Sequence, residues 1–174
     1  MPATRTTALP GRGPEYSPDY YGAFVSDPAG NSAEAVHVGP RRYNGVLDHL
    51  WVRVRNLADS TRFYETIAPT VGHQATRRPP RSAAVPERTR VHGDGPSFSL
   101  LQGDATEHLH LAFSAPDQDT VRAFHQAGID AGYRSLGEPG ERPDYHPGYY
   151  GAYLADPDEN NVEAVFHERM VNRG

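Results

Sequence analysis

Histidine and glutamate are the side chains of this sequence best suited to chemistry. The chain has nine His and no Cys, which excludes thiolate metal sites, cysteine nucleophiles and disulfides. It has no Lys either, which excludes Schiff-base catalysis. What remains is metal binding by His and carboxylate groups, or acid–base catalysis by the same side chains.

Three segments, 47–54, 108–113 and 161–167, alternate polar and apolar residues as half-buried strands do. In each segment one face is apolar and the other carries a possible metal ligand. Two His and one carboxylate form the facial triad that binds Fe(II) and related divalent metals. We therefore expect the three polar faces to curve around one cavity. The candidate ligands are His49, His110 and Glu163.

Two helices are expected to support these strands. Residues 58–67 follow the first strand, with Asp59 or Ser60 as the N-cap, and residues 117–131 follow the strand at 108–113. Short strands come after each helix, so the coarse pattern is βαβββ, repeated once. The expected short strands are 88–92, 96–102, 149–155 and 161–167.

The front of the chain repeats part of its end. Residues 10–36 align without a gap with residues 139–165, and the identical pairs include Tyr20 with Tyr149 and Glu34 with Glu163. We interpret the front as the tail of a mostly missing first domain. Glu34 should bind no metal, because its His partners are missing. The expected division is 1–43 (two strands plus a linker), 44–168 (the main domain) and 169–174 (a C-terminal tail).

Three motifs carry a resemblance to a known family. The segments DHLWVRVRNLADSTRFY (48–64), HLHLAF (108–113) and YYGAYLADPDENNVEAVFH (149–167) resemble the vicinal oxygen chelate superfamily of glyoxalase I, extradiol dioxygenases and bleomycin- and fosfomycin-resistance proteins. The resemblance implies an α+β fold. In that fold two βαβββ modules form a curved, partly open, barrel-like sheet around a cavity, with the helices on the outer face.

The resemblance also implies roles for particular residues. The family's metal ligands match His49, His110 and Glu163, and the implied cofactor is a divalent metal ion, with Fe(II) favoured and Mn, Ni or Zn as alternatives. Ring-cleaving members have a Tyr ten residues before the Glu, which Tyr153 matches, and an acid/base His near the place of His146.

The fourth strand of the first module separates the possible activities. It reads SFSLLQG at 97–103 and lacks the carboxylate that glyoxalase I uses. We therefore favour extradiol-dioxygenase-like chemistry, with a glyoxalase I-like lyase as the alternative. A third possibility is a metal-free, bleomycin-resistance-like binding protein whose cavity is lined by Trp51, Tyr149 and Tyr153.

Polar and aromatic residues on the same faces are candidates for binding the substrate. Arg53 would bind an anionic substrate or pair with Glu163. The substrate-binding candidates are Trp51, Arg53, Ser99 and Tyr149.

Composition limits the partners. The net charge of −5 gives no basic footprint for nucleic acid, and no apolar run is long enough for a membrane span or a signal peptide. We expect a cytoplasmic protein that acts on a small molecule and forms a homodimer.

Overall fold

The computed structural model describes residues 5–13, 18–38, 47–80, 86–93 and 97–168. The chain forms two compact units, Met1–Asp48 and His49–Gly174, and each is described by itself. The expected linker that ends at residue 43 and the tail at 169–174 lie outside the described residues.

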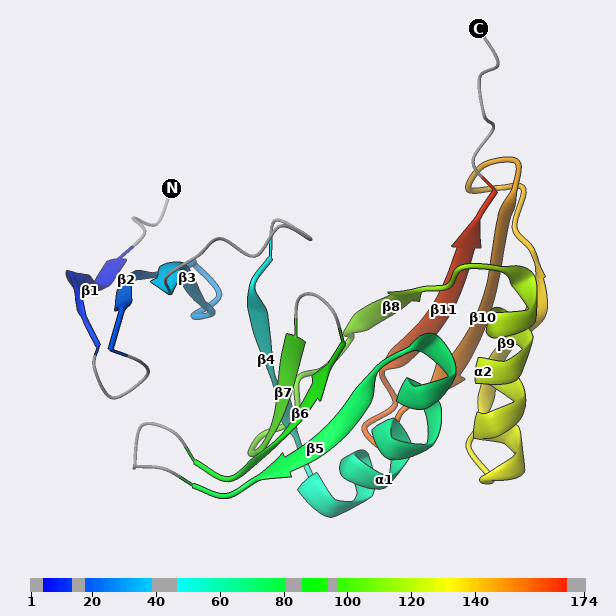
Figure 1. Cartoon of the computed structure of the whole chain (residues 1–174), viewed down its shortest axis with the longest axis horizontal. Helices are drawn as coiled ribbons and strands as arrows, with labels where there is room; N and C mark the ends of the chain where they lie inside the picture. Colours follow the sequence, from blue (N-terminus) through cyan, green and yellow to red (C-terminus); the bar gives the residue numbers. More distant parts are fainter. Residues whose placement is uncertain (1–4, 14–17, 39–46, 81–85, 94–96, 169–174) are drawn as a thin grey trace, which may run out of the picture. The chain divides into compact units, whose positions relative to one another are not determined.

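The N-terminal unit is a three-stranded antiparallel sheet in the order β1-β2-β3 (Figure 1). The repeat predicted only its last two strands. The additional strand, β1, was missed because two register shifts interrupt its pairing with β2, and such bulges break the alternation that marks a strand. The strands are β1 (Arg5–Arg12), β2 (Tyr20–Ser26) and β3 (Ser32–Val38).

The second unit begins with a βαβββ module whose sheet has the order β4-β7-β6-β5. Strands β4 and β7 pair in parallel, and the other pairs are antiparallel. A short 3-10 helix, η1, continues α1. The elements are β4 (His49–Val54), α1 (Leu57–Ile67), η1 (Ala68–Val71), β5 (Gln74–Arg78), β6 (Arg88–His92) and β7 (Ser97–Gln102).

A second βαβββ module follows, with the equivalent strand order β8-β11-β10-β9. The predicted α+β fold of two modules is therefore confirmed, with two four-stranded sheets that are not closed into a barrel. The elements are β8 (His110–Ser114), α2 (Gln118–Asp130), β9 (Ser135–Glu141), β10 (Tyr149–Ala155) and β11 (Asn161–His167).

The helix starts correct one expectation. Asn56, and not Asp59 or Ser60, caps α1: its side chain accepts hydrogen bonds from the backbone N–H groups of Ala58 and Asp59. Asp117 caps α2 in the same way, through the N–H of Thr120. The helical segment thus begins one residue before the predicted 58, and Asp59 lies in its first turn.

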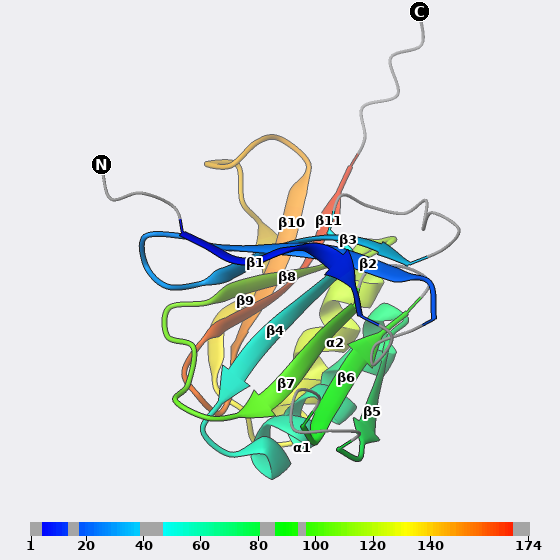
Figure 2. The same ribbon diagram turned by 90° about the vertical axis from the view of Figure 1, so that its left-hand side faces the viewer.

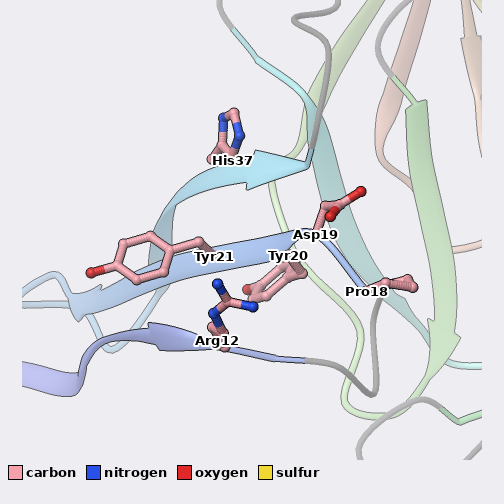
Figure 3. A pocket seen from close by; sticks show the side chains of 6 residues that line it. All are labelled: Arg12, Pro18, Asp19, Tyr20, Tyr21 and His37. Carbon is pink, nitrogen blue, oxygen red and sulfur yellow. The ribbon is translucent and has the colours of Figure 1, made fainter.

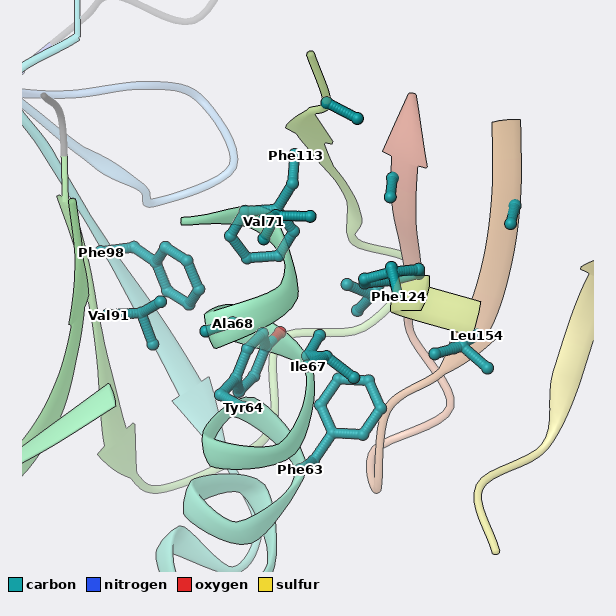
Figure 4. Close-up of a cluster of buried hydrophobic side chains, with 14 of the residues drawn as sticks. Phe63, Tyr64, Ile67, Ala68, Val71, Val91, Phe98, Phe113, Phe124 and Leu154 are labelled. Carbon is teal, nitrogen blue, oxygen red and sulfur yellow. The ribbon is translucent and has the colours of Figure 1, made fainter. Parts of the chain in front are cut away.

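One hydrophobic core joins both modules. The apolar faces of the two sheets pack against α1 and α2, and in Figure 2 both helices lie behind the β4-β7-β6-β5 sheet. Phe63 and Phe124, from the two helices, are fully buried there together with Leu154 of β10 (Figure 4). Because each sheet gives its apolar face to the helices, its polar face is left available for a site.

No helix among the described residues is long and apolar enough to cross a membrane.

Candidate functional site

The polar face of the β8-β11-β10-β9 sheet carries a buried carboxylate, Glu163. In the β10–β11 register Glu163 lies directly opposite Tyr153, and across the parallel β11–β8 pair it lies opposite Ala112. Residues two apart on a strand share a face, so His110 of β8 lies diagonally from Glu163. Strand pairing therefore brings together residues that are 53 positions apart in the sequence.

Both carboxylate oxygens of Glu163 have a partner. His110 Nε2 lies 2.8 Å from Oε2, and the Tyr149 hydroxyl donates a 2.6 Å hydrogen bond to Oε1. Glu163 is 1% exposed, and a buried carboxylate is costly unless it is paired and hydrogen-bonded. Tyr149 and His110 therefore fix both the position and the orientation of the group.

Gly151 of β10 makes room for this carboxylate. A Cβ atom at Gly151 would lie 2.7 Å from Oε1 of Glu163, 3.2 Å from Cε1 of Tyr149 and 3.4 Å from the Tyr153 hydroxyl. Real side chains do not approach so closely, so no larger residue fits without moving Glu163 or its neighbours.

The two tyrosines of this face are held in their protonated form. Burial, reinforced by the charge of Glu163, raises the pKa of Tyr153 to about 12. Burial and the hydrogen bond to Glu163 raise the pKa of Tyr149 further. Both hydroxyls are therefore hydrogen-bond donors at neutral pH, and neither acts there as a base.

His146, the predicted acid/base residue, belongs to a neighbouring cluster. Its Nε2 atom lies 3.0 Å from Nδ1 of His167, and the two rings stack with their centroids 5.2 Å apart. Both rings also contact Tyr149 edge-on, at 5.4 Å and 5.0 Å between centroids. His146 thus reaches Glu163 only through Tyr149. Alternation along β11 places His167 on the polar face, but no sequence pattern indicates its pairing with His146.

The remaining predicted residues lie on the polar face of the other sheet. His49, Trp51 and Arg53 alternate along β4, and Ser99 of β7 lies opposite Trp51 in the register. Arg53 and Glu163 lie on different sheets, and the backbone N–H of Arg53 donates to the Thr106 hydroxyl at 3.1 Å. The predicted site residues are therefore divided between the two sheets.

Two of the candidate donors, His110 and Glu163, lie close enough together to bind one metal ion. The 2.8 Å between His110 Nε2 and Glu163 Oε2 suits two adjacent ligands that each lie about 2.0–2.2 Å from one ion. A triad needs a third donor, and within the described part of the chain no group of three His, Asp or Glu side chains is placed to hold an ion. His110 and Glu163 fit two adjacent coordination positions, and His49 lies on β4 of the other sheet.

The turn before β11 connects the two modules close to this face. Asp156 accepts hydrogen bonds from the backbone N–H groups of Asp158 and Asn160, both at 2.8 Å. Asp158 in turn accepts a 3.0 Å bond from the N–H of Arg55, just after β4. Glu159 has a φ of 68°, a left-handed conformation that favours Gly.

The N-terminal unit repeats half of the arrangement around Glu163. The Tyr20 hydroxyl donates to Glu34 Oε1, as Tyr149 does to Glu163. This unit also has a hollow of about 380 Å³ (Figure 3), which contains none of the predicted site residues. The hollow is lined by Arg12, Pro18, Asp19, Tyr20, Tyr21 and His37.

Comparison with known protein families decides the relationship. Residues 46–164 match the model of the Glyoxalase/Bleomycin resistance protein/Dioxygenase superfamily. The chain belongs to this superfamily. No curated protein matches the sequence.

Solved structures with the superfamily fold agree. A glyoxalase/bleomycin resistance protein from Albidiferax ferrireducens T118 is 27% identical and matches 71% of this chain and 100% of its own, with a TM-score of 0.59. A superfamily domain from Frankia sp. EAN1pec is 19% identical over 72% of this chain and 94% of its own, with a TM-score of 0.55. A V278E mutant of glyoxalase I from Zea mays is 19% identical over 94% of this chain and 59% of its own, with a TM-score of 0.65.

Proposed function

We propose that this superfamily member is a metal-dependent enzyme that acts on a small molecule with vicinal oxygens. The observation that carries the proposal is the buried Glu163 carboxylate, which is anchored by Tyr149 and lies 2.8 Å from the half-exposed His110. These two residues would hold a divalent metal ion, and His49 would provide the third ligand. When bound, the ion would serve as a Lewis acid and as a template for the substrate oxygens.

The chain's own residues have separate tasks in this proposal. Tyr149 orients the carboxylate, because its hydroxyl is engaged with Oε1 of Glu163. Tyr153 keeps its proton at neutral pH and donates a hydrogen bond to a substrate oxygen. His146 can exchange protons with His167 and with solvent at the exposed edge of the cluster.

The β7 strand favours extradiol-dioxygenase-like chemistry over a glyoxalase I-like isomerisation. The polar face of β7 carries Ser97 and Ser99, neither of which is a carboxylate base. Gln102 lies on the opposite face, where its Oε1 accepts a hydrogen bond from the N–H of Leu57 at the start of α1. A proton abstraction of the glyoxalase I kind would therefore lack a base on this strand.

A metal-free binding protein is the second candidate. It is favoured by the division of the three donors between two sheets, and by the hydrogen bonds that already satisfy both oxygens of Glu163. Such a protein would hold an aromatic or cationic compound against Trp51, Tyr149 and Tyr153.

Metal analysis of untagged protein purified without chelator separates the two candidates. The enzyme proposal expects about one Fe, Mn, Ni or Zn per chain, and loss of most of it in His49→Ala, His110→Ala and Glu163→Ala. Glu65→Ala is the control, because Glu65 is an exposed carboxylate on α1 and is not one of the candidate ligands. Protein that contains no metal, and takes none up on reconstitution, would refute the enzyme proposal.

Activity measurements then distinguish the reactions. Protein loaded with Fe(II) under anaerobic conditions is mixed with a panel of catechols in an oxygen electrode. Oxygen uptake supports the extradiol proposal. Turnover of the methylglyoxal–glutathione adduct by Ni- or Zn-loaded protein, without oxygen uptake, would reverse the order of the two reactions.

A further inference from the structure

The polar face of the β4-β7-β6-β5 sheet has an unusual charge. Its strand register aligns residues from all four strands into three rows. One row is Gln74, His92, Ser97 and His49; the next is Thr76, Arg90, Ser99 and Trp51; the third contains Arg78 and Arg88, with Leu101 and Arg53 at the same level on β7 and β4. Four of these twelve residues are Arg, two are His, and none is acidic.

The arginines are concentrated on β5 and β6. Arg78 and Arg88 lie directly opposite each other, and Arg90 follows on the same face of β6. Like charges directly opposite each other in a sheet are destabilising in themselves. A hydrogen bond of 3.1 Å from Arg90 Nε to the Ser97 hydroxyl orients one of the guanidinium groups.

The behaviour of His92 agrees with a positive potential at this face. Partial burial lowers its pKa, and the charges of Arg90 and Arg78 lower it further. His92 Nε2 also lies 3.3 Å from the Thr76 hydroxyl. The imidazole is therefore held neutral beside the arginines and can take part in hydrogen bonding to a ligand.

Trp51 gives the same face an apolar contact. It is 45% exposed and lies in the row of Arg90, separated from it by the small side chain of Ser99. Guanidinium groups bind carboxylates and phosphates through paired hydrogen bonds. An exposed indole ring next to them contacts the apolar part of the same ligand.

From this arrangement we infer that the β4–β7 face binds an organic oxyanion, whose charged group contacts Arg78, Arg88 and Arg90 and whose apolar part lies against Trp51. This names the substrate class of the proposed enzyme, and it rests on the proposal that the polar sheet faces bind the substrate. It does not depend on the metal, because neither the three arginines nor Trp51 is a proposed metal ligand.

Trp51 is the only Trp of the chain, so its fluorescence reports on this face alone. The full-length protein, freed of metal with chelator, is titrated with benzoate, phenylphosphonate and the neutral analogue benzyl alcohol. Saturable changes with the two anions, but not with benzyl alcohol, are expected, and added salt should weaken binding. The anion that binds more tightly shows whether the face prefers a carboxylate or a phosphonate.

Substitutions test the arginines directly. Arg78→Gln and Arg90→Gln should each weaken anion binding by about tenfold. Arg78→Lys keeps the charge but loses the paired hydrogen bonds, and should give an intermediate loss. Arg62→Gln is the control, because it makes the same charge change on α1, where Arg62 pairs with Asp59.

Two results would overturn the inference. One is equal binding of the anions and benzyl alcohol; the other is equal affinity in the Arg78, Arg90 and Arg62 variants, with circular dichroism confirming that all are folded. Either result would leave the metal proposal standing, because metal content is measured separately. Conversely, anion binding by a protein that takes up no metal would support this face and refute the enzyme.

Discussion

The hydroxyl of Tyr149 donates a 2.6 Å hydrogen bond to Oε1 of Glu163, and the same pairing occurs between Tyr20 and Glu34 in the N-terminal unit. The two pairs differ in their surroundings. Glu163 is 1% exposed and has His110 on its other oxygen, whereas the repeat aligns 10–36 with 139–165 and includes no counterpart of the segment that carries His110. The repeat therefore provides, within one chain, a second tyrosine–glutamate pair with which the Tyr149–Glu163 pair can be compared.

Removal of the Tyr149 hydroxyl should destabilise the second module. Tyr149→Phe leaves a buried carboxylate oxygen without its donor, which should lower the free energy of unfolding by about 1–3 kcal/mol. Urea denaturation measures the change. Tyr145→Phe is the control, because Tyr145 is 63% exposed; equal effects of the two substitutions would mean that the hydrogen bond to Glu163 contributes little.

Enlargement of Gly151 should displace the carboxylate. The new Cβ of Gly151→Ala would lie 2.7 Å from Oε1 of Glu163, and overpacking of this kind costs about 1–3 kcal/mol. The melting temperature and the metal content should both fall. Gly103→Ala meets only the flexible side chain of Arg53, at 3.3 Å, and should change neither; a Gly151→Ala protein with unchanged stability and metal content would contradict the described geometry.

Tyr153 should make stability depend on alkaline pH. Its pKa is raised from 10.0 to about 12 in the folded chain, so the folded state favours the protonated phenol. This contribution is fully present below pH 10 and is lost as the pH rises from 10 to about 12. The difference in unfolding free energy between the wild type and Tyr153→Phe should narrow over that interval, whereas a constant difference would show that the pKa is not raised.

The turn that precedes β11 should contribute more to the free energy of unfolding than its copy in the N-terminal unit. Asp156 is 3% exposed and accepts three hydrogen bonds; Asp27 accepts two from Asn31 at an exposed site. Asp156→Ala should lower the free energy of unfolding by about 2–4 kcal/mol, because buried donors lose their acceptor. Asp27→Ala should lower the free energy of unfolding by less than half as much in the same urea experiment. A larger loss in Asp27→Ala than in Asp156→Ala would contradict the greater role of the turn before β11.

Removal of residues 1–43 should leave the main domain folded. The hydrophobic core consists of residues between Val52 and Ala164 together with partly buried neighbours up to Phe166, so none of its members is deleted. Circular dichroism and cooperative unfolding would check this, and size-exclusion chromatography would show whether the oligomeric state changes. An unfolded product would refute the expected boundary at 43/44.

Much of this architecture follows from the sequence alone. Strict alternation in β4, β8 and β11 was enough to assign Val52, Phe113 and Val162 to the core face, because a strand exposes its two faces in turn. All three are buried. Strand β5 (QATRR) and strand β9 (SLGEPGE) went unassigned, because both have few apolar residues and are held by pairing with their neighbours.

The candidate site likewise has one part that follows from the sequence and another that only the structure decides. The sequence by itself determined that His49, His110 and Glu163 lie on polar strand faces, because side-chain direction depends only on position along a strand. Only the tertiary structure decided that Glu163 meets His110 and Tyr149, and that His49 belongs to another sheet beside four arginines. Those contacts depend on which strands pair and in what register, and pairing is set by the packing of distant segments around one core.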